Sequence, residues 1–376
     1  HFEFFPSGDI SVDSSFQFIG LTFRGGRAQD RGGSFVLQNS SHSGGGGFPS
    51  FEQHSTVLRP KFVDCVFIDN IAGGGNQFYG QGGAFYIENA SPIFENCVFD
   101  TNYADAGGAL YFSGNSDHES EKAYIRNSVF RANDAFSELA DGQGGAIAVG
   151  VVQKLTISNS LFESNEAGSS NFHARGGAIY ISSDWDPFSG SSVEILNSRF
   201  SLNSTFSNIN PADGGAIYVG APFKMHGSVV DSNRVVAYGQ NQFGAGAGIY
   251  IDLFSINKSG GNHRGTVELI NNTIVNNFAE GSVQSIGGGI ADMNIDQHEN
   301  IWFNNIIWGN GTNDPNSFSN GIHMQVQSNG NVRDQGTSWN GYNNIQDLET
   351  LRQAYNYDFG ENTISVDPNF KSAGSY

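Results

Sequence analysis

The sequence has little of what would cross-link a chain covalently or carry it through a membrane. Its only cysteines are Cys65 and Cys97, which excludes a disulfide framework and a cysteine-based metal cluster. No run of about 18 apolar residues occurs, so no transmembrane helix is expected. The sequence begins at His1 without a signal peptide. We therefore expect a fragment or mature piece, with its targeting segments missing rather than absent in nature.

Basic side chains are also scarce. Eighteen Lys and Arg stand against 37 Asp and Glu, which gives a net charge of −19. This balance excludes an overall basic surface that would bind nucleic acid. An anionic membrane surface would also repel the chain. The negative charge keeps an extended protein soluble. We expect no cofactor, with calcium as the alternative, because carboxylates permit calcium binding without demonstrating it.

Glycine and phenylalanine are abundant, at 50 and 31 residues, and they recur in a repeated unit. The first half of the unit reads apolar-x-Asn-small-x-Phe-x-x-Asn, as in Ile125–Asn133 and Ile157–Asn165. The second half is Gly-Gly-Ala-Ile-Tyr-Ile or a variant, starting for example at Gly176. Both halves are short, alternate apolar and polar residues, and are bounded by turn residues, which predicts strands of period two. Such strands bury an apolar face only when the copies stack.

The sequence therefore predicts an all-β fold, a right-handed parallel β-helix of about eight to ten coils. We expect residues 1–310 to form the helix, with the first residues irregular or capping. Residues 311–376 would form a terminal coil or cap of the same domain. Asparagines would then stack in two ladders of amide hydrogen bonds, and phenylalanines would stack inside. One predicted ladder contains Asp64, Asn96, Asn127, Asn159, Asn197, Asn271 and Asn304; the other contains Asn70, Asn102, Asn133, Asn165, Asn203, Asn233, Asn277 and Asn310.

The stacking has three further consequences. Cys65 and Cys97 would lie in adjacent coils, at a distance that a disulfide can span, and we expect two buried thiols rather than a bridge. Replacing Asn159 by leucine would cost about 1 to 3 kcal/mol through unpaired neighbours. Asn-x-Ser/Thr sequons suggest a glycoprotein if the source is eukaryotic, with Asn271 inaccessible inside a ladder and the loop sites as carriers. These loop sites are Asn39, Asn89 and Asn257.

The paired motif, Gly-Gly-Ala-Ile with Phe-x-x-Asn, resembles the repeats of the polymorphic outer membrane proteins of chlamydiae over roughly residues 60 to 310. The segments Asn304–Asn310, Tyr342–Gln346 and Val366–Phe370 are similar to the ends of secreted bacterial right-handed β-helix repeat proteins. The resemblance implies export, a surface location and adhesion to a polymer or a cell. It fixes no activity, because such helices carry many functions. The chain lacks that family's membrane barrel and any visible anchor.

Loop lengths point to one candidate surface. Every second coil carries an insertion at the same edge: Ser113 to Ala123, Ser182 to Ser192 and Asp252 to Gly265. Insertions of this kind often carry the function of a repeat protein. The aromatic and acidic side chains of these insertions are suited to binding sugars or calcium, and Asp184 and Asp186 are the candidate metal ligands. The alternative is that the insertions are solvated loops whose charge only keeps the protein soluble. The ridge residues are Asp117, His118, Glu119, Glu121, Asp184, Trp185, Asp186, Asp252, His263 and Arg264.

The tyrosines after Gly-Gly-Ala-Ile form a second candidate surface. Isoleucines that point inward on both sides would turn each tyrosine outward. A stacked aromatic strip would bind sugar rings or a protein, unless neighbouring links fold over it. The strip consists of Tyr86, Tyr111, Tyr180, Tyr218 and Tyr250.

Candidate catalytic residues are weaker. Asp100, Arg131 and Glu163 take equivalent outward positions in three successive coils, where carboxyls two coils apart reach a shared substrate. They are equally typical of a solvated strand face. We expect a non-enzymatic extracellular adhesin or structural module that binds a glycan or protein partner. The alternatives are a polysaccharide lyase or glycoside hydrolase, and a spacer or filament subunit that associates end to end.

Overall fold

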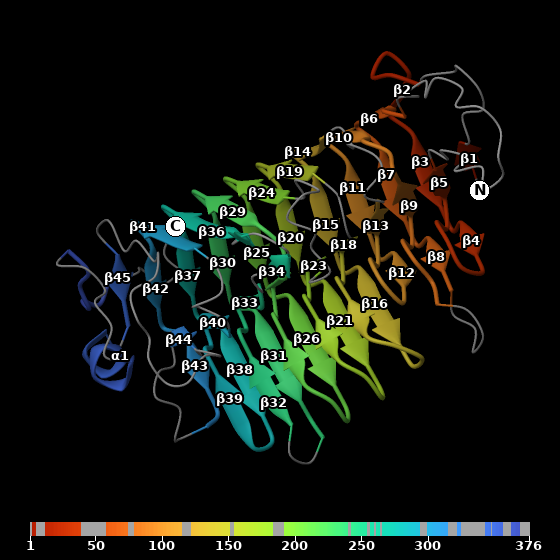
Figure 1. Ribbon diagram of the computed structural model, residues 1–376. Coiled ribbons are helices and arrows are strands. Elements are labelled where there is room, and N and C mark those ends of the chain that lie inside the picture. Colours follow the sequence, from red (N-terminus) through yellow and green to blue (C-terminus); the bar gives the residue numbers. More distant parts are fainter. Residues whose placement is uncertain are drawn as a thin grey trace, which may run out of the picture.

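Short parallel strands stack in five columns in the computed structural model, and together they form a right-handed parallel β-helix (Figure 1). The structure describes residues 2–4, 12–38, 58–73, 79–114, 122–150, 154–182, 192–239, 242–253, 256–258, 261–263, 265–293, 299–314, 322–324, 343–346, 348–355 and 362–368. We number the sheets in the order in which the chain passes through them in one coil. The fold class is the one that the repeat predicts.

Sheet 1 has nine strands: β2 (Gln17–Ile19), β6 (Lys61–Val63), β10 (Ile93–Glu95), β14 (Ala123–Arg126), β19 (Lys154–Ser158), β24 (Ser192–Leu196), β29 (Phe223–His226), β36 (Thr266–Ile270) and β41 (Glu299–Phe303). Sheet 2 has ten: β3 (Thr22–Arg24), β7 (Val66–Ile68), β11 (Val98–Asp100), β15 (Val129–Arg131), β20 (Leu161–Glu163), β25 (Arg199–Ser201), β30 (Val229–Asp231), β37 (Thr273–Val275), β42 (Ile306–Trp308) and β45 (Asn344–Ile345).

Sheet 3 has nine strands: β4 (Arg27–Ala28), β8 (Ile71–Ala72), β12 (Tyr103–Ala104), β16 (Asp134–Ser137), β21 (Glu166–Ser169), β26 (Ser204–Ser207), β31 (Arg234–Ala237), β38 (Phe278–Gly281) and β43 (Gly311–Thr312). Sheet 4 has five strands: β17 (Gly142–Gln143), β22 (Ala174–Arg175), β27 (Ala212–Asp213), β32 (Phe243–Ala245) and β39 (Gln284–Ile286). Isolated parallel bridges at Arg31, Gln81 and Ala106 continue it into the earlier coils.

Sheet 5 contains the Gly-Gly-Ala-Ile strands and has ten members: β1 (Phe2–Phe4), β5 (Phe35–Gln38), β9 (Phe85–Glu88), β13 (Leu110–Ser113), β18 (Ile147–Val149), β23 (Ile179–Ile181), β28 (Ile217–Val219), β33 (Ile249–Ile251), β40 (Ile290–Asp292) and β44 (Ile322–Met324). A small antiparallel pair, β34 (Ile256–Lys258) and β35 (Gly261–His263), lies between β33 and β36. Helix α1 (Leu348–Tyr355) follows β45, and its Leu348 and Leu351 join the core at that end.

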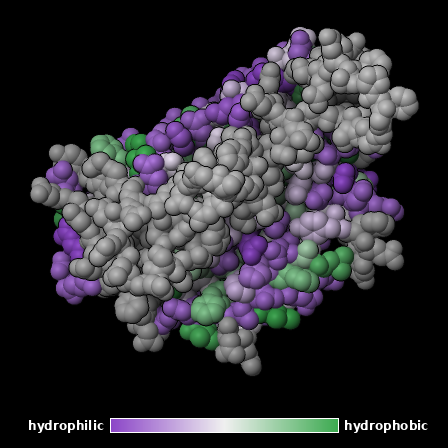
Figure 2. Space-filling view, in the orientation of Figure 1, coloured by the Kyte–Doolittle hydropathy of each residue, from purple (hydrophilic) through white to green (hydrophobic). Residues whose placement is uncertain are grey.

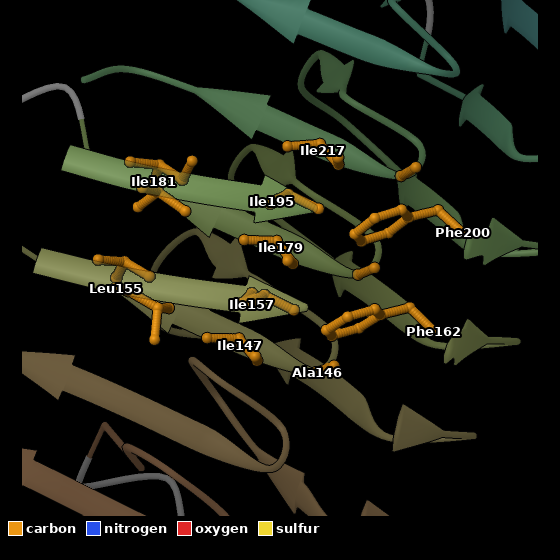
Figure 3. Close-up of a cluster of buried hydrophobic side chains, with 14 of the residues drawn as sticks. Ala146, Ile147, Leu155, Ile157, Phe162, Ile179, Ile181, Ile195, Phe200 and Ile217 are labelled. Atoms are coloured by element: carbon orange, nitrogen blue, oxygen red, sulfur yellow. The ribbon is translucent and has the colours of Figure 1, made fainter. Parts of the chain in front are cut away.

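Like side chains stack on like inside the coils. The rings of Phe67, Phe99, Phe130, Phe162 and Phe200 are stacked with centroids 4.5 to 4.9 Å apart, which confirms the predicted phenylalanine column. Figure 3 shows Phe162 and Phe200 beside the isoleucine pairs of the same coils. Cys65 and Cys97 are buried free thiols, and burial raises the pKa of Cys97 to about 12. This agrees with the expectation of two thiols.

The second predicted ladder is confirmed along its whole length. In every step from Asn70 to Asn310 the side-chain Nδ2 donates to Oδ1 of the asparagine one coil further on, at 2.9 Å. All eight asparagines are at most 3% exposed. The amides therefore satisfy each other where water does not reach them.

The first predicted ladder holds at its start, where Asn96 Nδ2 donates to Asp64 at 3.1 Å, but it is wrong by one residue from Asn127 to Asn197. Asn127, Asn159 and Asn197 are exposed and take left-handed φ values of 48° to 50°, which explains the preference for asparagine at this turn. The buried ladder belongs to the next residue, where each backbone N–H donates to the side-chain oxygen one coil on, as from Ser128 to Ser160 at 3.2 Å. Asn271 lies in the exposed column, so its predicted inaccessibility is also wrong. The true ladder contains Ser128, Ser160, Ser198, Ser228, Asn272, Asn305 and Asn343.

Candidate functional site

The predicted tyrosine strip lies on the outer face of sheet 5. Tyr86 pairs in register with Tyr111, and Tyr180 with Tyr218 and Tyr250, with ring centroids 5.2 to 5.7 Å apart. Most of the rings are nevertheless covered: Tyr218 is 2% exposed, and Tyr86 and Tyr180 are also buried, whereas Tyr111 and Tyr250 are half-buried. Ala148 interrupts the strip between Tyr111 and Tyr180. The outward direction is confirmed, but the strip is not an open platform for sugar rings. Residues of the neighbouring links cover the tyrosines, which was the alternative prediction from the sequence.

Charged residues cover part of this tyrosine layer. The Tyr218 hydroxyl donates to Asp252 at 2.8 Å, and the Arg175 guanidinium lies 5.4 Å from the Tyr218 ring centroid. Arg175 also pairs with Asp141 at 2.8 Å, and the Tyr79 hydroxyl donates to the Asp141 carbonyl. Sheet 4 supplies Arg175 from β22, so the longer links bring these charges over the tyrosines.

Asp213 is the most unusual member of this layer. It follows Arg175 in register and is 6% exposed. Its carboxyl has no hydrogen bond to any residue in the described part of the chain. Burial raises the pKa of Asp213 to about 7; Arg175 opposes this effect, whereas Asp252 and Asp141 add to it. Asp213 and Asp252 lie near each other, as the two carboxyls of an acid–base pair do, but the burial of both Asp213 and Tyr218 leaves no open path to them for a polymer.

The buried Asp213 carboxyl should make the protein less stable as the pH rises. Below pH about 4 the carboxyl is protonated in both states; between about 4 and 7 only the unfolded chain ionises, so stability falls, and above 7 the loss is constant. We expect Asp213→Asn to gain about 2 kcal/mol at pH 8 and little at pH 4. The gain is smaller than the pKa shift suggests, because the amide is itself buried without a partner.

Urea unfolding at the two pH values measures this prediction, with the exposed Asp30→Asn as the matched control. Some pH dependence will remain in Asp213→Asn, because burial also raises the pKa of Asp134 to about 7. An Asp213→Asn protein that loses stability equally at both pH values would contradict the assignment.

The weak catalytic candidates occupy equivalent positions, as predicted. Asp100, Arg131 and Glu163 pair in register along sheet 2. An Arg131 side-chain nitrogen donates to Asp100, and this bond raises the Arg131 pKa. Arg199 and Asp231 repeat the pair further along the same sheet at 2.9 Å. These are half-exposed ion pairs of a solvated strand face, and nothing about them points to catalysis.

The three insertions leave sheet 5 and return to sheet 1, at the same edge of the helix. They connect β13 to β14, β23 to β24 and β33 to β36. The ridge residues Asp117, His118, Glu119, Glu121, Asp184, Trp185, Asp186 and Arg264 lie outside the described residues, as does the side chain of His263. Asp252, at the base of the third insertion, is described and bonds Tyr218. Among the described residues no group of three His, Cys, Asp or Glu is placed to hold a metal.

A different edge, where sheet 3 turns into sheet 4, carries exposed apolar side chains. Leu139, Ile209 and Val283 are 45 to 55% exposed. Figure 2 shows apolar atoms along this edge as separate patches among hydrophilic atoms. Phe172 and Tyr238, which are 40 and 63% exposed, lie at the same turn in the coils between them.

A shallow groove of about 370 Å³ runs along the turn between sheets 1 and 2. It crosses four coils, and each coil contributes equivalent residues. One wall is the exposed left-handed column Asn127, Asn159 and Asn197, and the opposite wall is formed by Val129, Leu161 and Val229 together with Arg199. The sequence analysis missed this groove, because it placed the asparagine column inside the helix.

No helix in the described part of the chain is both long and apolar enough to cross a bilayer. Comparison with protein-family models, with curated proteins and with solved structures finds no match for this chain. The resemblance to the chlamydial repeats and to the secreted β-helix proteins therefore stays a prediction. Function has to be inferred from the geometry described above.

Proposed function

We propose that the chain is an extracellular binding module, secreted or at the cell surface, that presents loops from one edge of a rigid β-helix to a glycan or protein partner. The observation that carries this proposal is the common origin of the three insertions, all of which leave sheet 5 and return to sheet 1. Loops on a rigid scaffold are where binding residues concentrate.

The rigidity of the scaffold supports this role. The asparagine ladder and the serine–asparagine ladder hydrogen-bond one coil to the next through the helix, and the stacked phenylalanines fill its core. The strands from which the loops start and to which they return cannot move relative to each other, so the loop ends keep a fixed spacing. The protein therefore loses little conformational entropy when a partner binds.

The chain itself supplies the variant that tests the proposal. Gly220, Ala221 and Pro222 join β28 to β29 directly, whereas residues 182–192 make the equivalent connection one coil earlier. Replacing residues 182–192 by Gly-Ala-Pro removes an insertion and the first residue of β24, and keeps β23 and residues 193–196 in register. We expect this variant to lose most of the binding that the unchanged chain shows on a glycan array and to cultured cells, with the same unfolding midpoint.

The matched control is the double variant Leu139→Asn and Ile209→Asn, which changes a different edge and should bind normally. Full binding by the loop-replaced variant would overturn the proposal. Release of new reducing ends from an array glycan would instead favour a lyase or hydrolase.

A further inference from the structure

The groove between sheets 1 and 2 contains free hydrogen-bonding groups. Asn127, Asn159 and Asn197 are exposed, and their side-chain amides bond no residue in the described part of the chain. The buried asparagines of the neighbouring ladder differ in this respect, because each of their amides is satisfied. The left-handed backbone explains why asparagine stands at this turn. Each free amide offers two donors and an acceptor, and successive coils repeat it about every 4.8 Å.

The opposite wall has a complementary character. Val129, Leu161 and Val229 are half-buried and line the groove parallel to the amides. A ligand that lies along the helix axis would meet one amide and one aliphatic group in every coil. This pairing suits an extended sugar chain, whose hydroxyls bond to amides and whose C–H faces pack on aliphatic side chains.

The charges near the groove decide which kind of sugar chain fits. Arg199, the cation of the groove wall, is held by Asp231 through two hydrogen bonds of 2.9 and 3.0 Å. On the same face, Arg131 is held by Asp100. No unpaired cation among the described groove residues is left for a carboxylate or sulfate, and the net charge of −19 repels a polyanion.

We propose that this groove is a binding site for a neutral, linear glycan lying parallel to the helix axis across the coils from Asn127 to Gly227. The site deepens the binding function proposed above, on which it rests, by naming the ligand class and a surface outside the inserted loops. Asn127, Asn159 and Asn197 bond the hydroxyls of successive sugars, and Leu161 packs against a ring face.

The test uses the full chain and three neutral probes, the β-1,4-linked hexasaccharides of glucose, mannose and xylose, with the hexasaccharide of galacturonic acid as the charged comparison. Titration calorimetry measures each dissociation constant. The variant is Asn127→Gly, Asn159→Gly and Asn197→Gly combined. Glycine already occupies this left-handed position at Gly20 and Gly227, so the fold tolerates it. The matched control is Asn271→Gly, which removes an exposed amide of the same column outside the groove.

We expect the unchanged chain and Asn271→Gly to bind at least one neutral hexasaccharide with the same affinity, within twofold. The triple variant should bind it at least tenfold more weakly. Leu161→Glu, which changes the opposite wall of the groove, should weaken binding by a similar factor. The loop-replaced chain should keep the affinity of the unchanged chain for the hexasaccharide, so the array binding that it retains should be confined to neutral, linear glycans.

Absence of binding to all three neutral probes overturns the site, as does equal binding by the triple variant or tighter binding of the galacturonic acid probe. If the array binding of the triple variant equals that of the unchanged chain while the loop-replaced variant has lost it, the groove proposal fails and the proposed function stands. If the unchanged chain binds a hexasaccharide but binds neither the array nor cells, the groove proposal stands and the proposed function fails.

Discussion

Asn165→Leu should destabilise the protein by about 3 to 6 kcal/mol, because it breaks the asparagine ladder at its centre. Asn165 is fully buried, and its side chain takes part in four hydrogen bonds. Its Nδ2 serves the Phe130 carbonyl and the Asn203 oxygen, and its Oδ1 accepts from the backbone and side chain of Asn133.

Leucine would leave these partners buried without a replacement. The Asn133 backbone N–H and the Phe130 carbonyl each lose the ladder bond that Asn165 provides, and Asn203 loses a donor. An unsatisfied buried group costs about 1 to 3 kcal/mol, so the Asn133 N–H and the Phe130 carbonyl together account for about 2 to 6 kcal/mol. The bond lost by the Asn203 oxygen, which keeps the Asn165 backbone N–H, raises the lower end to about 3 kcal/mol. Urea unfolding followed by circular dichroism measures the loss.

Asn159→Leu is the matched comparison, six residues earlier in the same coil. Asn159 is exposed with φ +49°, so the cost of leucine there comes from the left-handed backbone, about 1 to 2 kcal/mol, and not from unpaired neighbours. Glycine separates the two causes: Asn159→Gly should be nearly neutral, whereas Asn165→Gly should remain strongly destabilising. Equal losses for Asn159→Gly and Asn165→Gly would show that the buried ladder does not stabilise the fold as described.

These two asparagines also show what the sequence could and could not predict. Both recur in every coil and both follow a strand, so the repeat placed both in columns. It could not tell which column is buried, because alternation between inside and outside restarts at each turn. A residue with a left-handed backbone takes one position in the chain, but its side chain does not point into the core. The small residue after it, such as Ser160, was the available signal for the buried ladder.

The tyrosines show a second limit. Period two gave their outward direction and their stacking correctly, as at Tyr180 and Tyr218. Their covering comes from residues of the links, such as Arg175 over Tyr218, and the strands of sheet 4 in those links are only two or three residues long. Arg175 and Asp213 stand directly before the Gly-Gly pair in adjacent coils, and this opposite charge at equivalent positions was the signal for the buried charged layer.

Gly145→Ala should cost at least about 3 kcal/mol, although it adds a single methyl group. A Cβ at Gly145 would lie 2.1 Å from the Gly177 carbonyl oxygen and 2.4 Å from that of Glu166. Both are backbone atoms of the next coil and cannot rotate away. The coils would have to separate locally, which weakens the parallel hydrogen bonds between β18 and β23.

The comparison that isolates this effect is Gly25→Ala. Gly25 has φ +69° and open space around its Cα, so alanine there meets backbone strain alone, about 1 kcal/mol. Gly145 has the opposite problem, crowding at an ordinary φ. The chain places Ala247 at the equivalent position two coils beyond Gly177, where the contact from Gly215 has widened to 2.5 Å, so close packing and not glycine itself is the requirement. If Gly145→Ala unfolds at the same urea concentration as Gly25→Ala, the coils are less tightly stacked at Gly-Gly than the structure has them.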